Sequence, residues 1–453
     1  MIESNHRFEG EGQTATLARR LGLFDATMLI MGGTIGSGIF MNPSLVARQV
    51  HTPVLVLGAW VFGGLIALTG AFIYAEVSNR LPRVGGQYAY LREAFDPLVA
   101  FLYGWVLLLV VQTGGMAAVS VTFARYFIEL TGLEVPVWAV AIIVLTALTL
   151  ANCLGVKSGS NLQSGLMVLK IAAIGFLVAA GIWLVHISHF SVKPIAGEPM
   201  SAGLLSSFGA AMIPVLFAYG GWQTGCFVAG ELREPRRDLP RALLLGVMGV
   251  VLLYVAVNFV CLRALGVDGL AASDAPASAV MQVALGRSGQ IAIALGITIS
   301  TLGFLSQSVL TAPRVYFAMA RDGIFFRQLA WVHPRTRVPV LAIVLQSAWT
   351  MLIVVSGSYG QILNYVTAMD WIFFGLTASC LFVLRRRDPS GAQFQMPGHP
   401  FSTGFFCVVC WSVVANAIYC YPRDTLIGMG ILISGVPVYF IWKKLRANEQ
   451  PTA

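Results

Sequence analysis

Long apolar runs follow one another along this chain, separated by short clusters of charge, proline and glycine. A helix needs about 20 apolar residues to cross the hydrocarbon core of a bilayer, and we place about twelve runs of that length. Their approximate limits are 23–46, 54–78, 97–127, 135–152, 163–186, 206–230, 240–263, 289–318, 338–356, 360–384, 404–421 and 426–442. Because lipid cannot satisfy exposed backbone polar groups, such spans form helices. The sequence therefore predicts an all-α polytopic membrane protein.

Composition and charge agree with a membrane protein. Hydrophobic residues make up 57% of the chain and charged residues 11%, and the mean hydropathy is +0.77, values that soluble domains rarely reach. Of the 29 lysines and arginines, 22 fall in one set of alternate loops, six fall in the opposite set, and Lys170 lies within a span. Because cytoplasmic loops are rich in lysine and arginine, we expect both termini in the cytoplasm. This bias explains the net charge of +9 without nucleic-acid binding.

Two of the apolar runs are interrupted near their middle by glycine. Residues 32–40 read GGTIGSGIF, and residues 217–222 read FAYGGW. Irregular backbone at membrane depth is tolerated only where protein or a watery cavity satisfies its polar groups. Glycine at one break alone is equally well explained by close helix packing. The matching second break favours a binding site of the kind found in transporters.

The breaks fall in the first and the sixth span, as they would in a five-plus-five inverted repeat. Two parallel halves of six spans remain an alternative from hydropathy. We expect a cytoplasmic tail at 1–22, a ten-helix transport core at 23–387, a cytoplasmic loop at 388–403, two accessory helices at 404–442 and a cytoplasmic tail at 443–453. Residues 1–20 are polar, so no signal peptide is expected.

Helix ends at a break expose free N–H groups on one side and free carbonyls on the other. The carboxylate of an amino acid suits the N–H groups around Ser37 and Gly38, and its ammonium group suits the carbonyls. Phe217 borders the second break and is expected to cover a bound ligand. The candidate substrate-binding residues are Thr34, Ile35, Gly36, Ser37, Gly38, Phe217, Ala218, Tyr219 and Gly220.

Polar residues inside the spans supply the remaining candidates. Lys170 lies in the fifth span, where it can substitute for a cation, relay a proton or hold the first helix; snorkelling to the surface is the alternative. Asp370 lies in the tenth span and can titrate, attract a cationic substrate or pack between helices. Gln223, Gln307 and Asp370 are the candidates for the side-chain pocket.

Other charged and thiol groups are read as structural. Glu76 and Glu231 lie near cytoplasmic helix ends, where solvated surface pairing with arginine is the favoured interpretation and closure of the inner side the alternative. The seven cysteines lie mainly in or beside apolar runs and are interpreted as packing residues, the Cys407 and Cys410 pair included. No metal site and no cofactor is expected.

The motifs resemble the amino acid-polyamine-organocation superfamily, especially bacterial amino acid permeases related to L-type amino acid transporters. Residues 33–40 are similar to its first-helix substrate motif, and residues 74–76 with 81–95 to its second-helix and loop signature. Residues 217–222, followed by residues 231–240, are similar to its sixth helix and loop. Further similarities are Arg314, residues 319–323 and residues 371–376.

The resemblance implies a LeuT-like fold that works by alternating access, with the substrate between the first and sixth helices. It implies that Lys170 matches a lysine near the sodium position of sodium-coupled relatives, which favours sodium-independent exchange or proton-linked uptake. It also implies a gating role for Tyr254 on the intracellular side of the site, with Lys170 and Phe217 as the other coupling or gating residues.

Two departures limit this transfer. Residues 129–136 contain no cysteine, so no disulfide-linked heavy subunit is expected as a partner. Asp370 stands where L-type carriers more often have a neutral polar residue, which puts a strictly neutral substrate range in doubt. The prediction is an amino acid transporter of the cytoplasmic (inner) membrane and not an enzyme. The alternatives are a polyamine or cationic amino acid carrier and an amino acid sensor that does not translocate.

Overall fold

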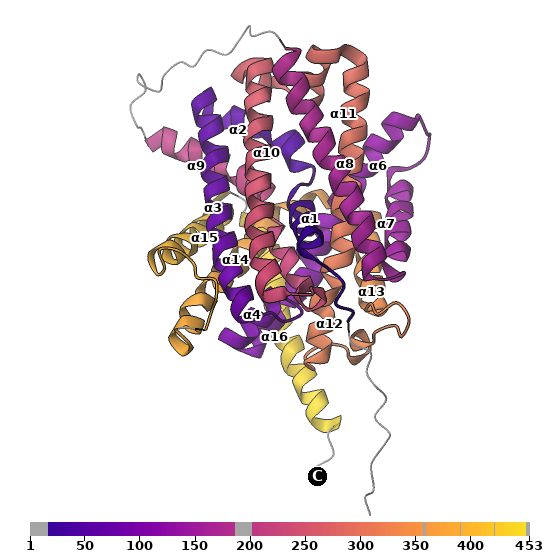
Figure 1. Ribbon diagram of the computed structural model, residues 1–453, viewed down its shortest axis with the longest axis vertical. Coiled ribbons are helices and arrows are strands. Elements are labelled where there is room, and N and C mark those ends of the chain that lie inside the picture. Colours follow the sequence, from indigo (N-terminus) through magenta and orange to yellow (C-terminus); the bar gives the residue numbers. More distant parts are fainter. Residues whose placement is uncertain (1–16, 186–201, 357–358, 390, 421, 450–453) are drawn as a thin grey trace, which may run out of the picture.

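The computed structural model describes residues 17–185, 202–356, 359–389, 391–420 and 422–449, and within them the chain is nearly all helical (Figure 1). Helices α1 (Leu23–Thr34) and α2 (Gly38–Val50) together make the first span, and their axes are bent by 43° at the break between them. Helix α9 (Ala202–Ala218) is followed by a 3-10 helix, η2 (Trp222–Glu231), so that the sixth predicted span is also interrupted.

The other predicted spans are each covered by helix, but some limits differ: the helix Pro276–Thr311 begins 13 residues before the predicted span 289–318, and the helix Pro235–Ala272 ends nine residues after the predicted span 240–263. The other elements are α3 (Pro53–Arg80), α4 (Gln87–Ala94), α5 (Pro97–Val106), the π-helix η1 (Leu107–Val111), α6 (Gln112–Thr131), α7 (Val137–Cys153), α8 (Val156–Trp183), α10 (Pro235–Ala272), α11 (Pro276–Thr311), α12 (Pro313–Arg321), the 3-10 helix η3 (Arg327–Ala330), α13 (Val340–Ser356), α14 (Tyr359–Arg387), α15 (Phe401–Cys420) and α16 (Pro422–Glu449).

Eight of the described helical stretches are long and apolar enough to cross a membrane, and the bent pair α1 and α2 makes a ninth. Helices α7 and α13 are apolar but shorter, with 17 residues each, and α9 has the same length. The structure is therefore that of a polytopic membrane protein. The count of twelve spans and the inverted repeat stay predictions.

Helix α1 lies inside the bundle (Figure 1), where it contacts α10, α8, α11 and η2. Long pairs surround it, because α10 packs along α3 and α11 packs along α8. Its residues from Leu29 to Thr34 are buried, so the helix that leads into the first break is held on several sides. The break therefore lies in the interior and is not exposed to lipid.

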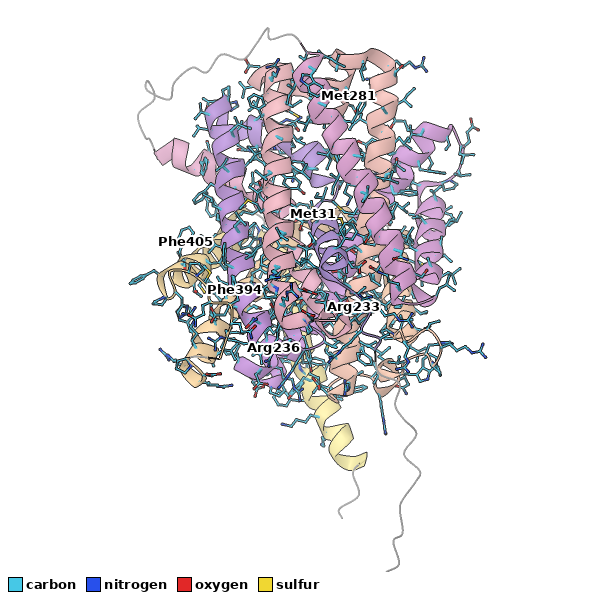
Figure 2. All side chains as sticks on the ribbon, viewed as in Figure 1. Met31, Arg233, Arg236, Met281, Phe394 and Phe405 are labelled. Atoms are coloured by element: carbon cyan, nitrogen blue, oxygen red, sulfur yellow. The ribbon has the colours of Figure 1, made fainter. Side chains whose placement is uncertain are left out.

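The two ends of the bundle differ in charge. Arg233 and Arg236 lie toward the end at which α16 finishes, and Met281 lies at the opposite end (Figure 2). We call the first of these the arginine-rich end. Arg48, near the last turn of α2, donates to the Ala271 carbonyl at the far end of α10 at 2.6 Å. Helix α2 therefore runs from the first break toward the end opposite the arginine-rich end.

The interpretation of Glu76 and Glu231 as solvated surface carboxylates is wrong. Glu76 has no exposed surface; its carboxylate lies 2.8 Å from Arg80, 2.6 Å from Arg385 and 2.6 Å from the Met396 amide N, all of which bind it. The helix-end position was read correctly, but the segment between α14 and α15 folds back over Glu76 and removes water. Sequence position near a helix end gave no information about this cover.

Candidate functional site

The first break opens the backbone over Ile35, Gly36 and Ser37. Helix α1 ends when the Ile35 amide donates to the Met31 carbonyl at 2.8 Å, and the Gly36 amide then donates to the Thr34 carbonyl at 3.0 Å. Helix α2 starts with Ser37 as its N-cap. Because the first amides of a helix have no intrahelical acceptor, the start of α2 presents N–H groups at the break. An anion is favoured there by these groups and by the helix dipole.

The second break is a turn through Tyr219, Gly220 and Gly221. The Gly220 amide donates to the Phe217 carbonyl at 3.1 Å, which tightens the end of α9. Gly221 has a φ of 102°, a conformation that residues with a side chain rarely adopt. Its amide donates to the Gln223 side-chain oxygen at 3.0 Å, so Gln223 caps the turn.

Two glycines allow the breaks to touch. A Cβ atom on Gly221 would lie 2.0 Å from the Gly33 carbonyl oxygen, and one on Gly33 would lie 2.8 Å from the Gly221 carbonyl oxygen. The Thr224 hydroxyl donates to the Gly221 carbonyl at 2.6 Å, and the Gln307 amide donates to the Thr224 hydroxyl at 2.6 Å. The breaks in α1 and α9 therefore face each other at backbone contact, held by a polar chain that starts on α11.

Tyr254 links the ends of both half-helices. Its hydroxyl lies 3.1 Å from the Thr34 carbonyl and 3.2 Å from the Ala218 carbonyl, and it donates its one proton between them. Its ring packs edge-on against Trp60 at a centroid distance of 5.6 Å and is fully buried. Tyr254 therefore ties together the last carbonyls of α1 and of α9.

Lys170 approaches the first break from α8. Its side chain has no exposed surface, and its ammonium group donates to the Ile35 carbonyl. Ser300 of α11 donates to the next carbonyl, that of Gly36, at 3.4 Å. Lys170 does not snorkel to the surface, and its amino group occupies the carbonyl side of this break.

A cavity of about 400 Å³ lies against both breaks. A volume of this size holds a small molecule. Most of the residues predicted for binding line it, and they are Thr34, Gly36, Ser37, Gly38, Phe217, Ala218, Gly220, Gln223, Gln307 and Asp370. Lining residues on α2 continue from Gly38 to Leu45, so the cavity extends from the breaks toward the end opposite the arginine-rich end.

Four of the predicted residues lie behind the cavity wall. Ile35 gives its carbonyl to Lys170, and Tyr219 directs its hydroxyl to the Trp60 carbonyl at 3.0 Å. Tyr254 and Lys170 are buried and line no part of the cavity. These four residues position the breaks and do not form the surface that a ligand would touch.

Sequence reasoning missed seven polar residues of the cavity wall, which are Asn42, Gln112, Thr122, Arg125, Thr224, Ser308 and Thr367. The Asn42 amide donates to the Pro214 carbonyl at 2.8 Å and thereby joins α2 to α9. Gln112 follows the π-helix η1, and such helical irregularities are frequent at functional sites. A polar residue inside the third apolar run was the available signal for Gln112, since polar side chains within spans face the bundle interior.

Asp370 and Phe217 are two predicted residues that line the cavity with their side chains. Phe217 is 39% exposed and lies beside the second break. Asp370 lines the cavity from α14, and its carboxylate has no hydrogen bond or ion pair within the part of the chain that the structure describes. A carboxylate with open lone pairs in a confined space favours a cation or a hydrogen-bond donor.

A buried ion pair lies on the side of the breaks toward the arginine-rich end. The Arg314 guanidinium lies 2.6 Å from the Glu231 carboxylate, and neither side chain has exposed surface. Arg314 also donates to the Leu310 carbonyl, and the Glu231 carbonyl accepts from the Arg20 and Leu21 amides at 3.0 Å each. Glu231 is thus the second carboxylate that was misread as solvated. The ion pair therefore joins η2 to α12, and the Glu231 carbonyl joins both to the segment at Arg20 and Leu21.

A Tyr254→Phe variant tests the link between the half-helices. Removal of the hydroxyl leaves two buried carbonyls without their donor, so we expect a loss of about 1–3 kcal/mol in stability, read as a lower midpoint of thermal unfolding. The matched control is Tyr316→Phe, because the Tyr316 hydroxyl is buried without a hydrogen-bond partner. Equal midpoints for the two variants would contradict the role given to Tyr254.

The chain is similar to known proteins over nearly its whole length. The profile of the family described as "Amino acid permease" matches residues 21–438. The serine/threonine exchanger SteT of Bacillus subtilis (strain 168) is 30% identical over 449 residues, which cover 95% of this chain and 98% of that protein. The large neutral amino acids transporter small subunit 2 of Homo sapiens is 29% identical over 442 residues, covering 95% and 81%.

The cystine/glutamate transporter of Homo sapiens is 28% identical over 439 residues, which cover 94% of this chain and 86% of that protein. The names of these relatives describe different amino acids. The matches extend over nearly the whole chain, so the similarity does not depend on the two glycine-rich breaks alone.

Proposed function

The chain belongs to the amino acid permease family of the amino acid-polyamine-organocation superfamily, as its motifs indicated, and from this premise we propose that it transports amino acids across the membrane. The observation that carries the proposal is the cavity of about 400 Å³ lined by both helix breaks. The polar groups that the breaks present to this cavity are mostly backbone N–H and carbonyl groups. These groups can bind the carboxylate and the ammonium group that all amino acids share. The named relatives are transporters or exchangers, which supports a carrier and not an enzyme.

The substrate carboxylate binds at the start of α2, at the N–H groups near Gly38 and the hydroxyl of Ser37. The substrate ammonium group binds the carbonyls of α1 and α9 that face the cavity. The Gly36 carbonyl accepts one bond from Ser300 and the Phe217 carbonyl accepts one from the Gly220 amide, and each keeps a second lone pair for the ammonium group. A side chain on Gly36 or Gly38 would stand between the ligand and these backbone groups.

Transport proceeds by alternating access in a LeuT-like five-plus-five fold. The cavity extends away from the arginine-rich end, and the Glu231 and Arg314 pair lies on the opposite side of the breaks, which supports an arrangement closed toward the cytoplasm. Phe217 covers the bound substrate before the inner side opens. The excess of positive charge in alternate loops supports cytoplasmic termini in an inner-membrane protein, and residues 129–136 offer no cysteine to a heavy subunit.

Uptake of radiolabelled amino acids into proteoliposomes tests the function. We expect uptake by the native protein, and about a tenfold loss of apparent affinity in Ser37→Ala, which removes one hydrogen bond to the substrate carboxylate. Ser412→Ala is the matched control, because Ser412 is exposed on α15 and bonds only to the Val408 carbonyl within its own helix. Binding without uptake would identify a sensor, and absence of both binding and uptake would overturn the proposal.

A carrier of cationic amino acids is the second candidate, and the unpaired carboxylate of Asp370 in the cavity favours it. An Asp370→Asn variant separates the two. If the substrate side chain is cationic, lysine, ornithine and arginine cease to compete with labelled substrate in the variant, while neutral amino acids compete as before. If the native protein is inhibited by neutral amino acids alone, the cationic assignment is wrong.

Lys170 bears on which ion or counter-substrate is coupled to transport. A protein ammonium group at the break stands where sodium would otherwise balance the carbonyls, which supports sodium-independent exchange or proton-linked uptake. Uptake with and without an imposed pH gradient, and with and without unlabelled amino acid inside the vesicles, distinguishes these two. A strict sodium requirement would contradict the proposed coupling.

A further inference from the structure

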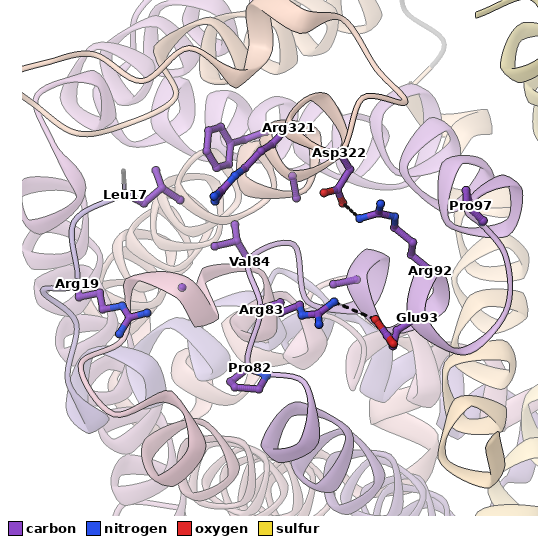
Figure 3. Close-up of a pocket in the computed structure, with 14 residues that line it drawn as sticks. Leu17, Arg19, Pro82, Arg83, Val84, Arg92, Glu93, Pro97, Arg321 and Asp322 are labelled. Carbon is purple, nitrogen blue, oxygen red and sulfur yellow. Dashed lines mark hydrogen bonds and ion pairs between the residues drawn. The ribbon is translucent and has the colours of Figure 1, made fainter. Parts of the chain in front are cut away.

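A second cavity, of about 1000 Å³, lies near the arginine-rich end and has no part in the amino acid site (Figure 3). Its wall is formed by residues 17–19, by the loop at 82–84, by α4 and the start of α5, by Gly230 at the end of η2, and by α12 with Asp322. This space is more than twice the volume of the cavity at the breaks. Its lining is charged, whereas the cavity at the breaks is mainly apolar and backbone.

Positive charge exceeds negative charge in this wall. Four arginines line it, namely Arg19, Arg83, Arg92 and Arg321, against two acids, Glu93 and Asp322. Each acid already has an arginine, because Arg83 lies 2.9 Å from Glu93 and Arg92 lies 2.5 Å from Asp322 (Figure 3). Arg19 and Arg321 have no hydrogen bond or ion pair to the rest of the described chain. Two positive charges are therefore left for a ligand.

Asp322 is further engaged from α4. The Tyr88 hydroxyl donates to Asp322 at 2.9 Å, and burial together with the neighbouring Asp322 carboxylate raises the pKa of Tyr88 above its ordinary range. Tyr88 therefore keeps its proton and its bond at physiological pH. Asp322 is held by both Arg92 and Tyr88, which keeps its carboxylate from turning to Arg321.

The two available arginines come from rigid positions. The amides of Arg20 and Leu21, directly after Arg19, donate to the Glu231 carbonyl at 3.0 Å each, so the main chain beside Arg19 is fixed. Arg321 ends α12, whose residues from Pro313 to Ala320 are buried. Both guanidinium groups are exposed to the same cavity without needing a change in backbone.

We propose that this cavity binds a phosphate-bearing anion, with Arg19 and Arg321 as its principal contacts. The planar fork of a guanidinium group matches phosphate oxygens in a bidentate arrangement, and the volume exceeds what a single amino acid requires. The source of the phosphate is either an anionic lipid headgroup, since the cytoplasmic leaflet is rich in these, or a soluble phosphate compound.

Binding would stabilise the closed inner side. Arg19 is tied through the next two amides to Glu231, and Arg321 lies about two helical turns after Arg314 on the same helix. An anion that joins Arg19 to Arg321 therefore joins the two elements that carry the buried ion pair. A ligand that prefers one conformation raises its population, so the anion favours the closed inner side.

Thermal unfolding of the full-length protein tests binding without any amino acid substrate, so the result is independent of the transport proposal. One arm titrates inorganic phosphate against chloride at equal ionic strength in detergent. The other compares nanodiscs of phosphatidylcholine with nanodiscs that also contain phosphatidylglycerol. We expect the midpoint to rise by roughly 3 °C in at least one arm at saturation. A rise in the phosphate arm identifies a soluble phosphate ligand, and a rise in the lipid arm alone identifies a headgroup.

The Arg19→Gln, Arg321→Gln double variant should lose this rise, and Arg19→Lys, Arg321→Lys should keep part of it, since lysine retains charge without the fork. Arg335→Gln is the matched control, because Arg335 is exposed and lies outside the cavity. No rise in either arm for the native protein, or a rise that the double glutamine variant retains, would overturn the proposal.

Discussion

Arg314→Met is expected to lower the stability of the protein by about 3–5 kcal/mol, because it leaves the Glu231 carboxylate buried without its partner. Both side chains lack exposed surface, and the ion pair joins η2 to α12 at 2.6 Å. Methionine fills a volume similar to that of arginine. The loss of stability is therefore caused by the unpaired Glu231 carboxylate and not by a cavity. The midpoint of thermal unfolding in detergent, followed by tryptophan fluorescence, measures it.

A second change distinguishes charge from packing. The double variant Glu231→Gln, Arg314→Met removes both charges, and we expect it to recover a large part of the loss, since an apolar or neutral replacement of a buried pair is often tolerated. Arg237→Met is the matched control: its partner Glu234 is 60% exposed, and exposed pairs contribute about 0–1 kcal/mol. If the double variant is no more stable than Arg314→Met, the ion pair is not the cause.

The double variant also bears on gating. If the pair holds the inner side closed, as we propose, its replacement should move the distribution of states toward the inward-open form. Accessibility of single cysteines introduced near Gly230 to a membrane-impermeant reagent would rise. Unchanged accessibility in a stable double variant would mean that other contacts close the inner side.

Gly221→Ala is expected to reduce amino acid uptake by at least roughly tenfold, because strain in a left-handed position costs about 1–3 kcal/mol before any clash. The clash is severe, since the new Cβ would lie 2.0 Å from the Gly33 carbonyl oxygen. The obstacle is backbone, so the two breaks must move apart. That movement displaces Thr34 and Ala218, whose carbonyls Tyr254 holds together.

For this prediction, folding is measured by the unfolding midpoint and transport by uptake, each separately. Gly175→Ala on α8 is the matched control: a Cβ there meets nothing within 4 Å, and alanine is the better helix former. We expect the control to show native uptake and an equal or higher unfolding midpoint. Uptake by Gly221→Ala at the native level would show that backbone contact between the breaks is not required.

Some of this architecture follows from local sequence. Glycine runs at 32–38 and at 220–221 weaken helix within long apolar runs, and the structure has a break at each position. Lys170 was expected to face the bundle interior because it lies within the fifth apolar run, and its side chain is buried there. Such features depend on residues close to one another along the chain.

Other features depend on residues far apart in the sequence. Glu76 is buried because residues near 396 return to cover it, and nothing in residues 70–80 records that return. Gln112 reaches the cavity through the orientation of α6 after a π-helix, and Tyr254 meets Thr34 and Ala218 only because α10 passes behind both breaks. Helical periodicity indicates a buried face but not which partner covers it.

The sequence alone determined that this chain is a membrane-embedded bundle with two interrupted helices, because bilayer thickness and backbone hydrogen bonding translate directly into apolar length and glycine. The tertiary structure decided that the two interruptions lie against each other around one cavity, that an aspartate faces that cavity, and that the carboxylates near the arginine-rich end are buried in ion pairs. These are contacts between distant segments, and their energies depend on distance and burial, which no local pattern of residues encodes.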